Sequence, residues 1–227
     1  MVIKNNIAAF TALLAPYGAR LVAVSKTHPV DKIKEAYACG QRLFGENKVQ
    51  EMQEKHAQLP DDIEWHLIGH LQRNKVKYVA PFVALIHSVD SLPLLLEINK
   101  QGEKINRVIH CLLQVFIASE ETKFGLDAGE LMDLVRSPQI KNLTHIQIDG
   151  LMGMASFTQN KEQIRNEFRT LKKLFDDIRL LSLQSNIQMK ELSIGMSSDY
   201  TLALEEGSTL VRVGTALFGE RNSHDLK

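Results

Sequence analysis

LVAVSKTHP, residues 21–29, opens with an apolar run that is typical of a buried strand and continues into a polar turn that contains Lys26. Pro29 follows at a place where a helix could begin, because proline is tolerated in the first turn of a helix. The stretch predicts a strand, a turn and the start of a helix, in that order. Repetition of this unit along the chain decides the fold.

Seven more apolar segments follow the first, with helical or polar patterns between them. Several are continuous rather than alternating, as in VIHCLLQV at residues 108–115, and continuous runs suit parallel strands that are covered on both faces. The eight predicted strands are 21–25, 42–45, 64–69, 83–88, 107–115, 145–150, 191–195 and 209–213.

The clearest helical pattern spans residues 161–183, where apolar side chains recur at spacings of three and four and trace a single stripe. Another helix is predicted to begin after Asp127 and to end near Ser137, because Pro138 follows. A short amphipathic helix is predicted within residues 1–15.

A strand followed by a helix, repeated about eight times, favours the α/β class and within it a (β/α)₈ TIM barrel. A doubly wound sheet is the alternative. A chain of 227 residues suits a barrel of this kind, so we expect a single domain over residues 1–227 that includes the additional N-terminal helix.

The composition excludes several functional classes. Lys and Arg together number 27, as do Asp and Glu, so the chain lacks the strongly basic balance that is typical of nucleic-acid binding. No apolar run approaches the length of a membrane span, and the N-terminus does not resemble a signal peptide. Cys39 and Cys111 cannot form a disulfide framework, and we expect both to be buried thiols of a cytoplasmic protein.

Lys26 is the first candidate for chemistry. In a barrel, the carboxyl ends of the strands form the active face, and Lys26 comes at such an end. Partial burial lowers the pKa of a lysine and frees its amine as a nucleophile toward aldehydes. The alternative is a loop lysine that points to water. His66 and His70 are spaced four apart but lack the glutamate of a metalloprotease motif, so no metal site is expected.

Two segments after the predicted seventh and eighth strands, SIGMSSD at 193–199 and RVGTALFG at 212–219, have the composition of a phosphate site. The loops after these strands are where barrels commonly hold a phosphate. Glycines allow the backbone to approach an anion, and hydroxyls donate to it. The alternative is a pair of ordinary turns with helix caps. The residues concerned are Gly195, Ser197, Ser198, Gly214 and Thr215.

Arg212 lies in the apolar run LVRVG, where an arginine needs a buried acceptor. A guanidinium only donates hydrogen bonds, so an unprotonated ring nitrogen of a ligand would suit it. The alternative is an ion pair with a barrel carboxylate such as Asp149 or Glu46.

Seven motifs occur here in an order that resembles the YggS/PROSC-type pyridoxal-phosphate homeostasis proteins. The resemblance covers nearly the whole chain, from about Leu21 to Arg221, and this family is similar in fold to the barrel domain of bacterial alanine racemase and of eukaryotic ornithine decarboxylase. The motifs are AVSKTHP, LFGENKVQE, WHLIGHLQRNK, LLQV with EETKFG, GLMGMA, LSIGMSSD and RVGTALFGER.

The resemblance implies a bound pyridoxal 5′-phosphate (PLP), held as an internal aldimine on Lys26. It also implies that Arg212 faces the pyridine nitrogen and that Asn47 and Met154 line the ring pocket. The phosphate would be held by Ser197, Ser198, Gly214 and Thr215.

Two neighbouring positions bear on the same pocket. The family often has an asparagine where Phe116 stands, and we expect the phenylalanine to alter the rim of the pocket. Lys123 is predicted to be a solvated loop charge rather than a second reactive lysine.

Three functions are open. The first, which the family implies, is a PLP-binding protein of intracellular PLP homeostasis that buffers or delivers the cofactor without catalytic turnover. The second is a PLP-dependent racemase or decarboxylase, and the third is a Schiff-base aldolase without PLP. An arginine on the pyridine nitrogen makes the ring a poorer electron sink, and the chain ends soon after the eighth strand, so we expect no second domain to supply a catalytic base. We expect a monomer whose partners are PLP and PLP-dependent apoenzymes, with no nucleic acid, membrane or metal.

Overall fold

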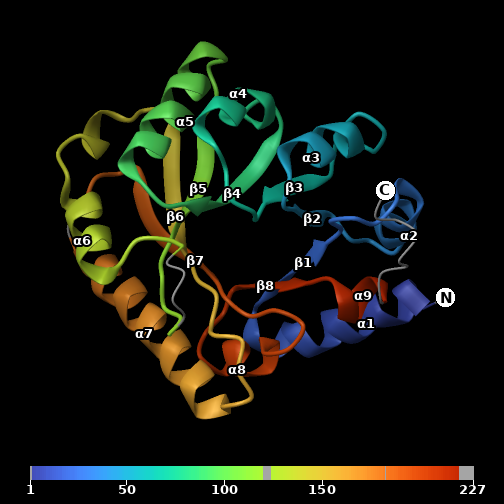
Figure 1. Cartoon of the computed structure of the whole chain (residues 1–227). Helices are drawn as coiled ribbons and strands as arrows, with labels where there is room; N and C mark the ends of the chain where they lie inside the picture. Colours follow the sequence, from blue (N-terminus) through green and yellow to red (C-terminus); the bar gives the residue numbers. More distant parts are fainter. Residues whose placement is uncertain (1, 120–123, 182, 220–227) are drawn as a thin grey trace.

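The computed structural model describes residues 2–119, 124–181 and 183–219. Eight parallel strands follow one another in chain order, and the last pairs with the first to close a barrel (Figure 1). The predicted (β/α)₈ barrel is confirmed, and the doubly wound alternative is wrong because such a sheet stays open. The strands are β1 (Arg20–Val24), β2 (Leu43–Glu46), β3 (Glu64–Leu67), β4 (Val83–Val89), β5 (Ile109–Gln114), β6 (Ile146–Met152), β7 (Ile187–Ser193) and β8 (Leu210–Val213).

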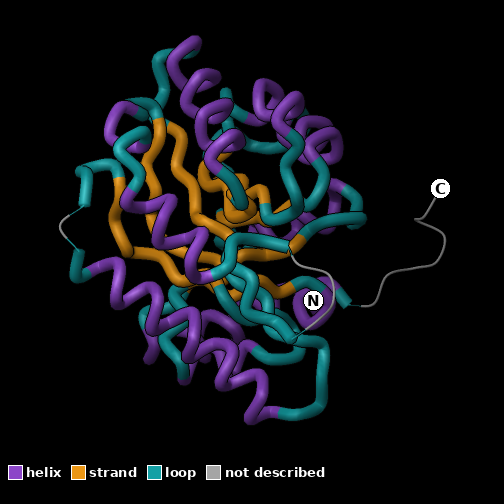
Figure 2. The backbone as a smooth tube through the Cα atoms, turned by 60° about the vertical axis from the view of Figure 1, so that its left-hand side comes forward, coloured by secondary structure: helices purple, strands orange, loops and turns teal. Residues whose placement is uncertain are grey.

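Helices lie outside the ring of strands (Figure 2). They bury the outward faces of the strands, which is why β4 and β6 are buried at nearly every position. The α-helices are α1 (Val2–Leu14), α2 (Val30–Ala38), α3 (Val49–His56), α4 (Val76–Val79), α5 (Leu92–Lys104), α6 (Ala128–Arg136), α7 (Lys161–Arg179), α8 (Tyr200–Glu205) and α9 (Thr215–Phe218). Short 3₁₀ helices occur at Ala15–Tyr17, Arg73–Lys75 and Ile140–Asn142.

The strand that departs most from its prediction is β7, which begins at Ile187, four residues before the predicted start at Glu191. Its first residues alternate between buried and exposed, so their polar members hid the strand in the sequence. Its junction with β8 is sparse, because the two strands share a single register pair, Ser193 with Leu210.

The predicted helices are present. In α6, Asp127 and Glu130 form a capping box, and the helix stops before Pro138. The stripe on α7 is buried as expected, although the helix ends at Arg179 rather than at residue 183. The N-terminal α1 packs beside α9, where Asn6 Nδ2 donates to the Leu217 carbonyl over 2.9 Å.

Among the described residues, no helix is both long and apolar enough to cross a membrane. The two cysteines differ from expectation in one respect. Cys111 is buried in β5, as predicted, whereas Cys39 is only half-buried at the end of α2. A residue at the end of an amphipathic helix keeps one side open to solvent, which corrects the prediction for Cys39.

Candidate functional site

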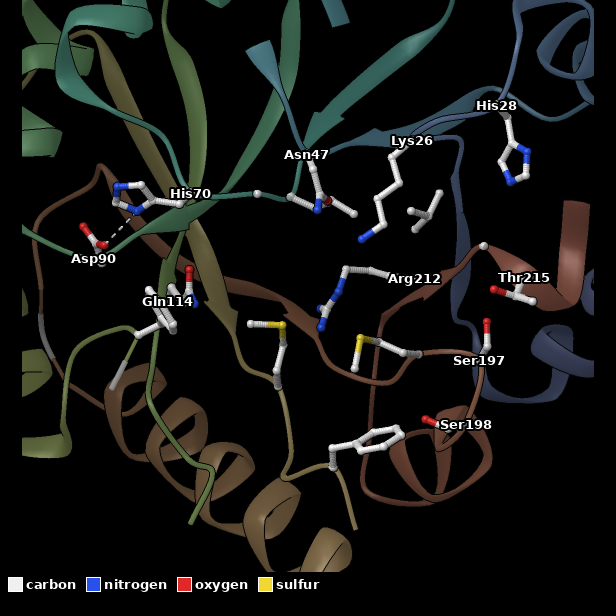
Figure 3. Close-up of a pocket in the computed structure, with 18 residues that line it drawn as sticks. Lys26, His28, Asn47, His70, Asp90, Gln114, Ser197, Ser198, Arg212 and Thr215 are labelled. Carbon is white, nitrogen blue, oxygen red and sulfur yellow. Dashed lines mark ion pairs between the residues drawn. The ribbon is translucent and has the colours of Figure 1, made fainter. Parts of the chain in front are cut away.

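One cavity, with a volume of about 490 Å³, opens where the strands end (Figure 3). It brings together the eight residues that the resemblance assigned to the PLP site, from the ends of β1, β2, β6, β7 and β8, whereas Gly195 of the predicted phosphate loops does not line it. The eight are Lys26, Asn47, Met154, Ser197, Ser198, Arg212, Gly214 and Thr215.

Lys26 lies in the turn after β1, and its amine extends toward Arg212 (Figure 3). The turn is strained, because Thr27 has a φ of 64°, a left-handed conformation that a β-branched residue rarely adopts. Such a residue costs about 1–3 kcal/mol and persists only where its surroundings hold it. The strain therefore marks the lysine turn as a held conformation.

Asn47 lines the cavity just after β2, and the loop that follows β3 passes very close to it. A Cβ atom on Gly69 would lie 2.3 Å from the carbonyl oxygen of Asn47, so only glycine allows this approach. Gly69 also lines the cavity. The sequence offered a signal for it, because Gly69 stands within the motif WHLIGHLQRNK.

The loops after β7 and β8 meet on one side of the cavity, where Ser197, Ser198 and Thr215 carry hydroxyls (Figure 3). After β7 the chain turns sharply, since Met196 N–H donates to Asp199 Oδ1 over 2.6 Å. Within the described residues, the backbone N–H groups of Ser197 and Ser198 have no acceptor. Free N–H groups beside hydroxyls form a cradle for an anion.

Arg212 is 4% exposed and is held by neutral acceptors. Its Nη1 donates to the Ser193 carbonyl over 2.7 Å and to Ser193 Oγ over 2.5 Å, and its Nη2 donates to the Gly153 carbonyl over 3.0 Å. Burial lowers its pKa to about 10, an effect that the nearby Asp199 opposes, so the guanidinium remains charged at neutral pH.

The two carboxylates proposed as ion-pair partners of Arg212 are engaged elsewhere. Asp149 lies 2.5 Å from Nδ1 of His110, and Glu46 lies 2.8 Å from the amine of Lys55. The ion-pair prediction for Arg212 is therefore wrong. Peptide carbonyls and a hydroxyl satisfy the buried guanidinium in their place.

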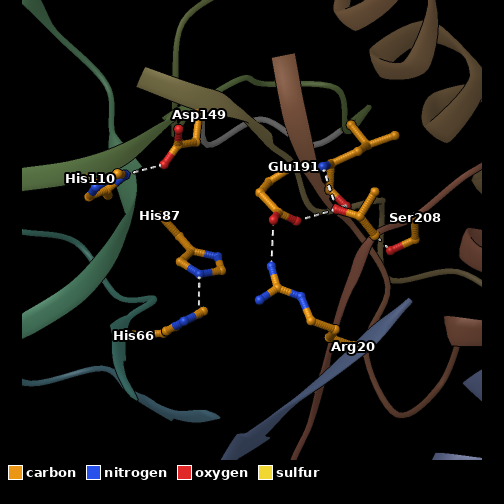
Figure 4. Close-up of polar contacts among 9 residues, drawn as sticks. Arg20, His66, His87, His110, Asp149, Glu191 and Ser208 are labelled. Carbon is orange, nitrogen blue, oxygen red and sulfur yellow. Dashed lines mark hydrogen bonds and ion pairs between the residues drawn. The ribbon is translucent and has the colours of Figure 1, made fainter. Parts of the chain in front are cut away.

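A chain of hydrogen bonds runs from Arg212 into the barrel interior. The Nδ1 atom of His87 lies 3.0 Å from Ser193 Oγ, and its Nε2 atom lies 2.9 Å from Nδ1 of His66 (Figure 4). Burial lowers the pKa of His66 to about 3 and that of His87 well below its usual value, so both rings are neutral. Because Arg212 only donates, Ser193 Oγ accepts from it, and the same oxygen links the guanidinium to the two neutral rings.

Sequence reasoning missed part of the cavity wall. His70 lies 3.5 Å from Asp90 and faces Gln114 across one end of the cavity (Figure 3). Phe124 and Phe157 lie at the exposed rim. His70, Gln114 and Phe124 belong to the motifs WHLIGHLQRNK and LLQV with EETKFG, whereas Phe157 and Asp90 carried no signal.

Phe116 is absent from the described lining of the cavity, so the prediction that it alters the rim is wrong. Its backbone N–H pairs with the Leu126 carbonyl over 2.9 Å, and Phe124 of the same loop takes the rim position. Lys123 lies outside the described residues.

Comparison with known proteins identifies the family. The family model for the N-terminal domain of alanine racemase matches residues 2–222. The pyridoxal phosphate homeostasis protein of Aquifex aeolicus is 44% identical over 204 residues, which are 89% of this chain and 87% of that protein. This chain belongs to the pyridoxal phosphate homeostasis protein family. The resemblance drawn from the seven motifs is confirmed.

A solved structure, that of PipY, the COG0325 family member of Synechococcus elongatus PCC7942, has the same fold. Its structure without PLP superposes with a TM-score of 0.88 at 39% identity, and its PLP-bound structure with a TM-score of 0.85 at 37% identity. Each alignment covers 96% of this chain and 100% of PipY. Among the described residues of this chain, no group of three or more His, Cys, Asp and Glu side chains could hold a metal ion.

Proposed function

We propose that this chain binds PLP in the barrel cavity and serves intracellular PLP homeostasis, by buffering or delivering the cofactor, without turning over amino acids. The observation that carries the proposal is the arrangement of Lys26, Arg212 and the hydroxyls of the β7 and β8 loops round one cavity. The name of the Aquifex aeolicus relative and the PLP-bound structure of PipY support it.

The residues present fit this cofactor group by group. An aldehyde requires an amine, which Lys26 supplies at the cavity wall. A phosphate ester requires donors, which the hydroxyls and free N–H groups of Ser197 and Ser198 supply, together with Thr215. A pyridine nitrogen requires a donor, and Arg212 uses only three of its five N–H groups within the described structure.

When bound, PLP would supply an electrophilic carbon and an electron sink. Lys26 would attach to that carbon through Nζ. Arg212 would keep its own proton and donate it as a hydrogen bond, so that the ring nitrogen stays unprotonated. Because His87 and His66 are neutral, they bring no mobile proton to this side of the ring. A site built in this way holds the cofactor firmly but activates it weakly.

The second function, a racemase or decarboxylase, is favoured by the family model, which is named after alanine racemase. A racemase needs acid and base groups on both faces of the substrate carbon. Tyr200, the tyrosine nearest to the site in sequence, packs its ring against Phe10 at 5.3 Å between centroids and does not line the cavity. This contact supports the non-catalytic reading.

The test is to incubate PLP-loaded protein with L-amino acids in deuterated water. We expect exchange of the α-proton, racemisation, decarboxylation and transamination no faster than with free PLP. Turnover of one substrate that is lost in Lys26→Ala would make the protein an enzyme. Purified protein that shows no visible cofactor absorbance after loading would favour the aldolase.

We further propose that the protein is a cytoplasmic monomer that delivers PLP to PLP-dependent apoenzymes. Light scattering on a sizing column would test whether the protein is a monomer. For delivery, an apoenzyme should regain activity faster from the loaded protein than from free PLP at the same concentration. Equal rates at every protein concentration would reject direct delivery.

A further inference from the structure

A buried ion cluster lies beneath the lysine turn and has no part in the function so far. Lys55 of α3 is 6% exposed, and its amine donates to Glu46 Oε1 over 2.8 Å and to Glu51 Oε1 over 2.7 Å. A third bond, of 2.8 Å, goes to the carbonyl of Ser25. Glu46 and Glu51 belong to the motif LFGENKVQE, of which only Asn47 reaches the cavity.

The cluster holds the residues on both sides of Lys26. Ser25 Oγ donates to Glu46 Oε1 over 2.5 Å, and Thr27 N–H donates to Glu51 Oε1 over 2.5 Å. Thr27 is the residue with the left-handed φ of 64°. The second βα unit of the barrel therefore holds the strained turn of the first, with the reactive lysine between the two held residues.

Such an ion cluster contributes little net free energy to folding. A buried ion cluster can often be replaced by apolar side chains with no loss, because desolvation offsets the attraction between the charges. Glu46 Oε2 is buried without a hydrogen-bond partner among the described residues, and burial raises the pKa of Glu46. What the cluster supplies in return is a fixed geometry for the turn.

We propose that Lys55 is a positioning residue for Lys26: together with Glu46 and Glu51, it holds the Ser25–Thr27 turn so that the Lys26 amine meets the aldehyde of the cofactor. None of the three charged residues lines the cavity, so they act through the turn. This inference rests on the proposed function, because it assumes that Lys26 attaches PLP.

The test separates covalent attachment from binding. Apoprotein is mixed with PLP, attachment is trapped over time with borohydride, and the affinity for pyridoxine 5′-phosphate, which has no aldehyde, is measured separately. In Lys55→Met we expect attachment to slow by about tenfold or more, because a small misplacement of a reacting group is costly. The affinity for pyridoxine 5′-phosphate should stay unchanged. Lys34→Met, at an exposed position of α2, is the matched control and should alter neither quantity.

A rescue experiment tests whether Lys55 acts on Lys26 through the Ser25–Thr27 turn. Glycine adopts a positive φ without steric cost, so Thr27→Gly added to Lys55→Met should restore part of the attachment rate. If Lys55→Met fails to fold, Glu51→Ala removes the acceptor of the Thr27 N–H group and should give the same selective loss.

The positioning role would be overturned in two cases. In the first, the affinity for pyridoxine 5′-phosphate falls by as large a factor as the rate of PLP attachment. In the second, folded Lys55→Met and Glu51→Ala attach PLP at the wild-type rate. Failure of the proposed function looks different. In that case the wild-type protein itself would trap no PLP on Lys26.

Discussion

Nη1 of Arg212 and Oγ of Ser193 lie 2.5 Å apart in the barrel interior. The arginine can only donate, so the hydroxyl accepts from it, and the same oxygen lies 3.0 Å from Nδ1 of His87. No described carboxylate forms an ion pair with Arg212. The orientation of a buried charge at the cavity wall thus depends on a neutral hydroxyl.

We expect Ser193→Ala to weaken PLP binding while leaving attachment at Lys26 possible. A hydrogen bond to a charged group is worth about 1.5–3 kcal/mol, so a loss of roughly tenfold in affinity is the expected scale. Titration of apoprotein with PLP measures it. Ser208→Ala is the matched control, because Ser208 is also buried but bonds to backbone carbonyls such as that of Ile194 over 2.8 Å. Similar losses of PLP affinity in both variants would contradict the role of Ser193.

Borohydride reduction of the PLP-loaded protein, followed by peptide mapping, should place the cofactor on Lys26. The amine lines the cavity, whereas Lys34 and many other lysines lie on the outer surface. Lys26→Ala should fold normally, because the residue is not part of the core, and should lose the visible absorbance of the bound cofactor. Labelling mainly on Lys123 would reject the assignment.

The phosphate should be essential for affinity. Ser198→Ala combined with Thr215→Ala removes two donors, and each is expected to contribute about 1.5–3 kcal/mol when bonded to a charged phosphate. This free energy corresponds to a fall in PLP affinity of roughly tenfold or more per contact. The affinity for pyridoxal, which has no phosphate, should not change. Ser137→Ala, at the end of α6, serves as a control. Equal affinity of the wild-type protein for pyridoxal and PLP would reject a phosphate site in these loops.

Acid should destabilise the fold through its buried histidines. The pKa of His66 is lowered to about 3 from 6.5, so the folded state keeps the ring neutral where the unfolded chain binds a proton. Below about pH 6.5 the free energy of unfolding should fall by up to about 1.4 kcal/mol per pH unit for His66, and the fall should level off near its folded pKa. His87 should add a contribution of the same sign.

Urea unfolding between about pH 7 and pH 4 measures this slope. His66→Gln keeps a polar side chain but cannot be protonated, so its slope should be smaller by about one proton. His145→Gln, at a half-buried position just before β6, is the control for replacing a histidine by glutamine. An unchanged slope in His66→Gln would show that His66 is not buried as a neutral ring.

Much of the barrel could be predicted, because parallel strands covered on both faces leave continuous apolar runs and helices leave periodic ones. The position of Lys26 followed from the same pattern, since a residue just after a strand falls on the active face. Arg212 was rightly expected to be buried, because an arginine within LVRVG has nowhere else to go.

The partners of these residues could not be predicted. Ser193 and His87 are 106 positions apart, and only closure of the barrel brings them together. Glu51 and Lys55 are spaced as an ordinary surface ion pair on a helix would be, so nothing in the sequence marks that lysine as buried. His87 stands out as a polar residue within the apolar run of β4, but the sequence does not indicate which residue is its partner.

The single register pair between β7 and β8 has a consequence for the lifetime of the protein. The loops that follow these two strands are the ones proposed to hold the phosphate. A bound ligand would therefore contact both sides of the junction with the fewest register pairs in the barrel. A ligand that binds only the closed form protects it in proportion to its concentration. We expect proteases to cut the ligand-free chain first near this junction, so that cofactor supply sets how long each molecule survives.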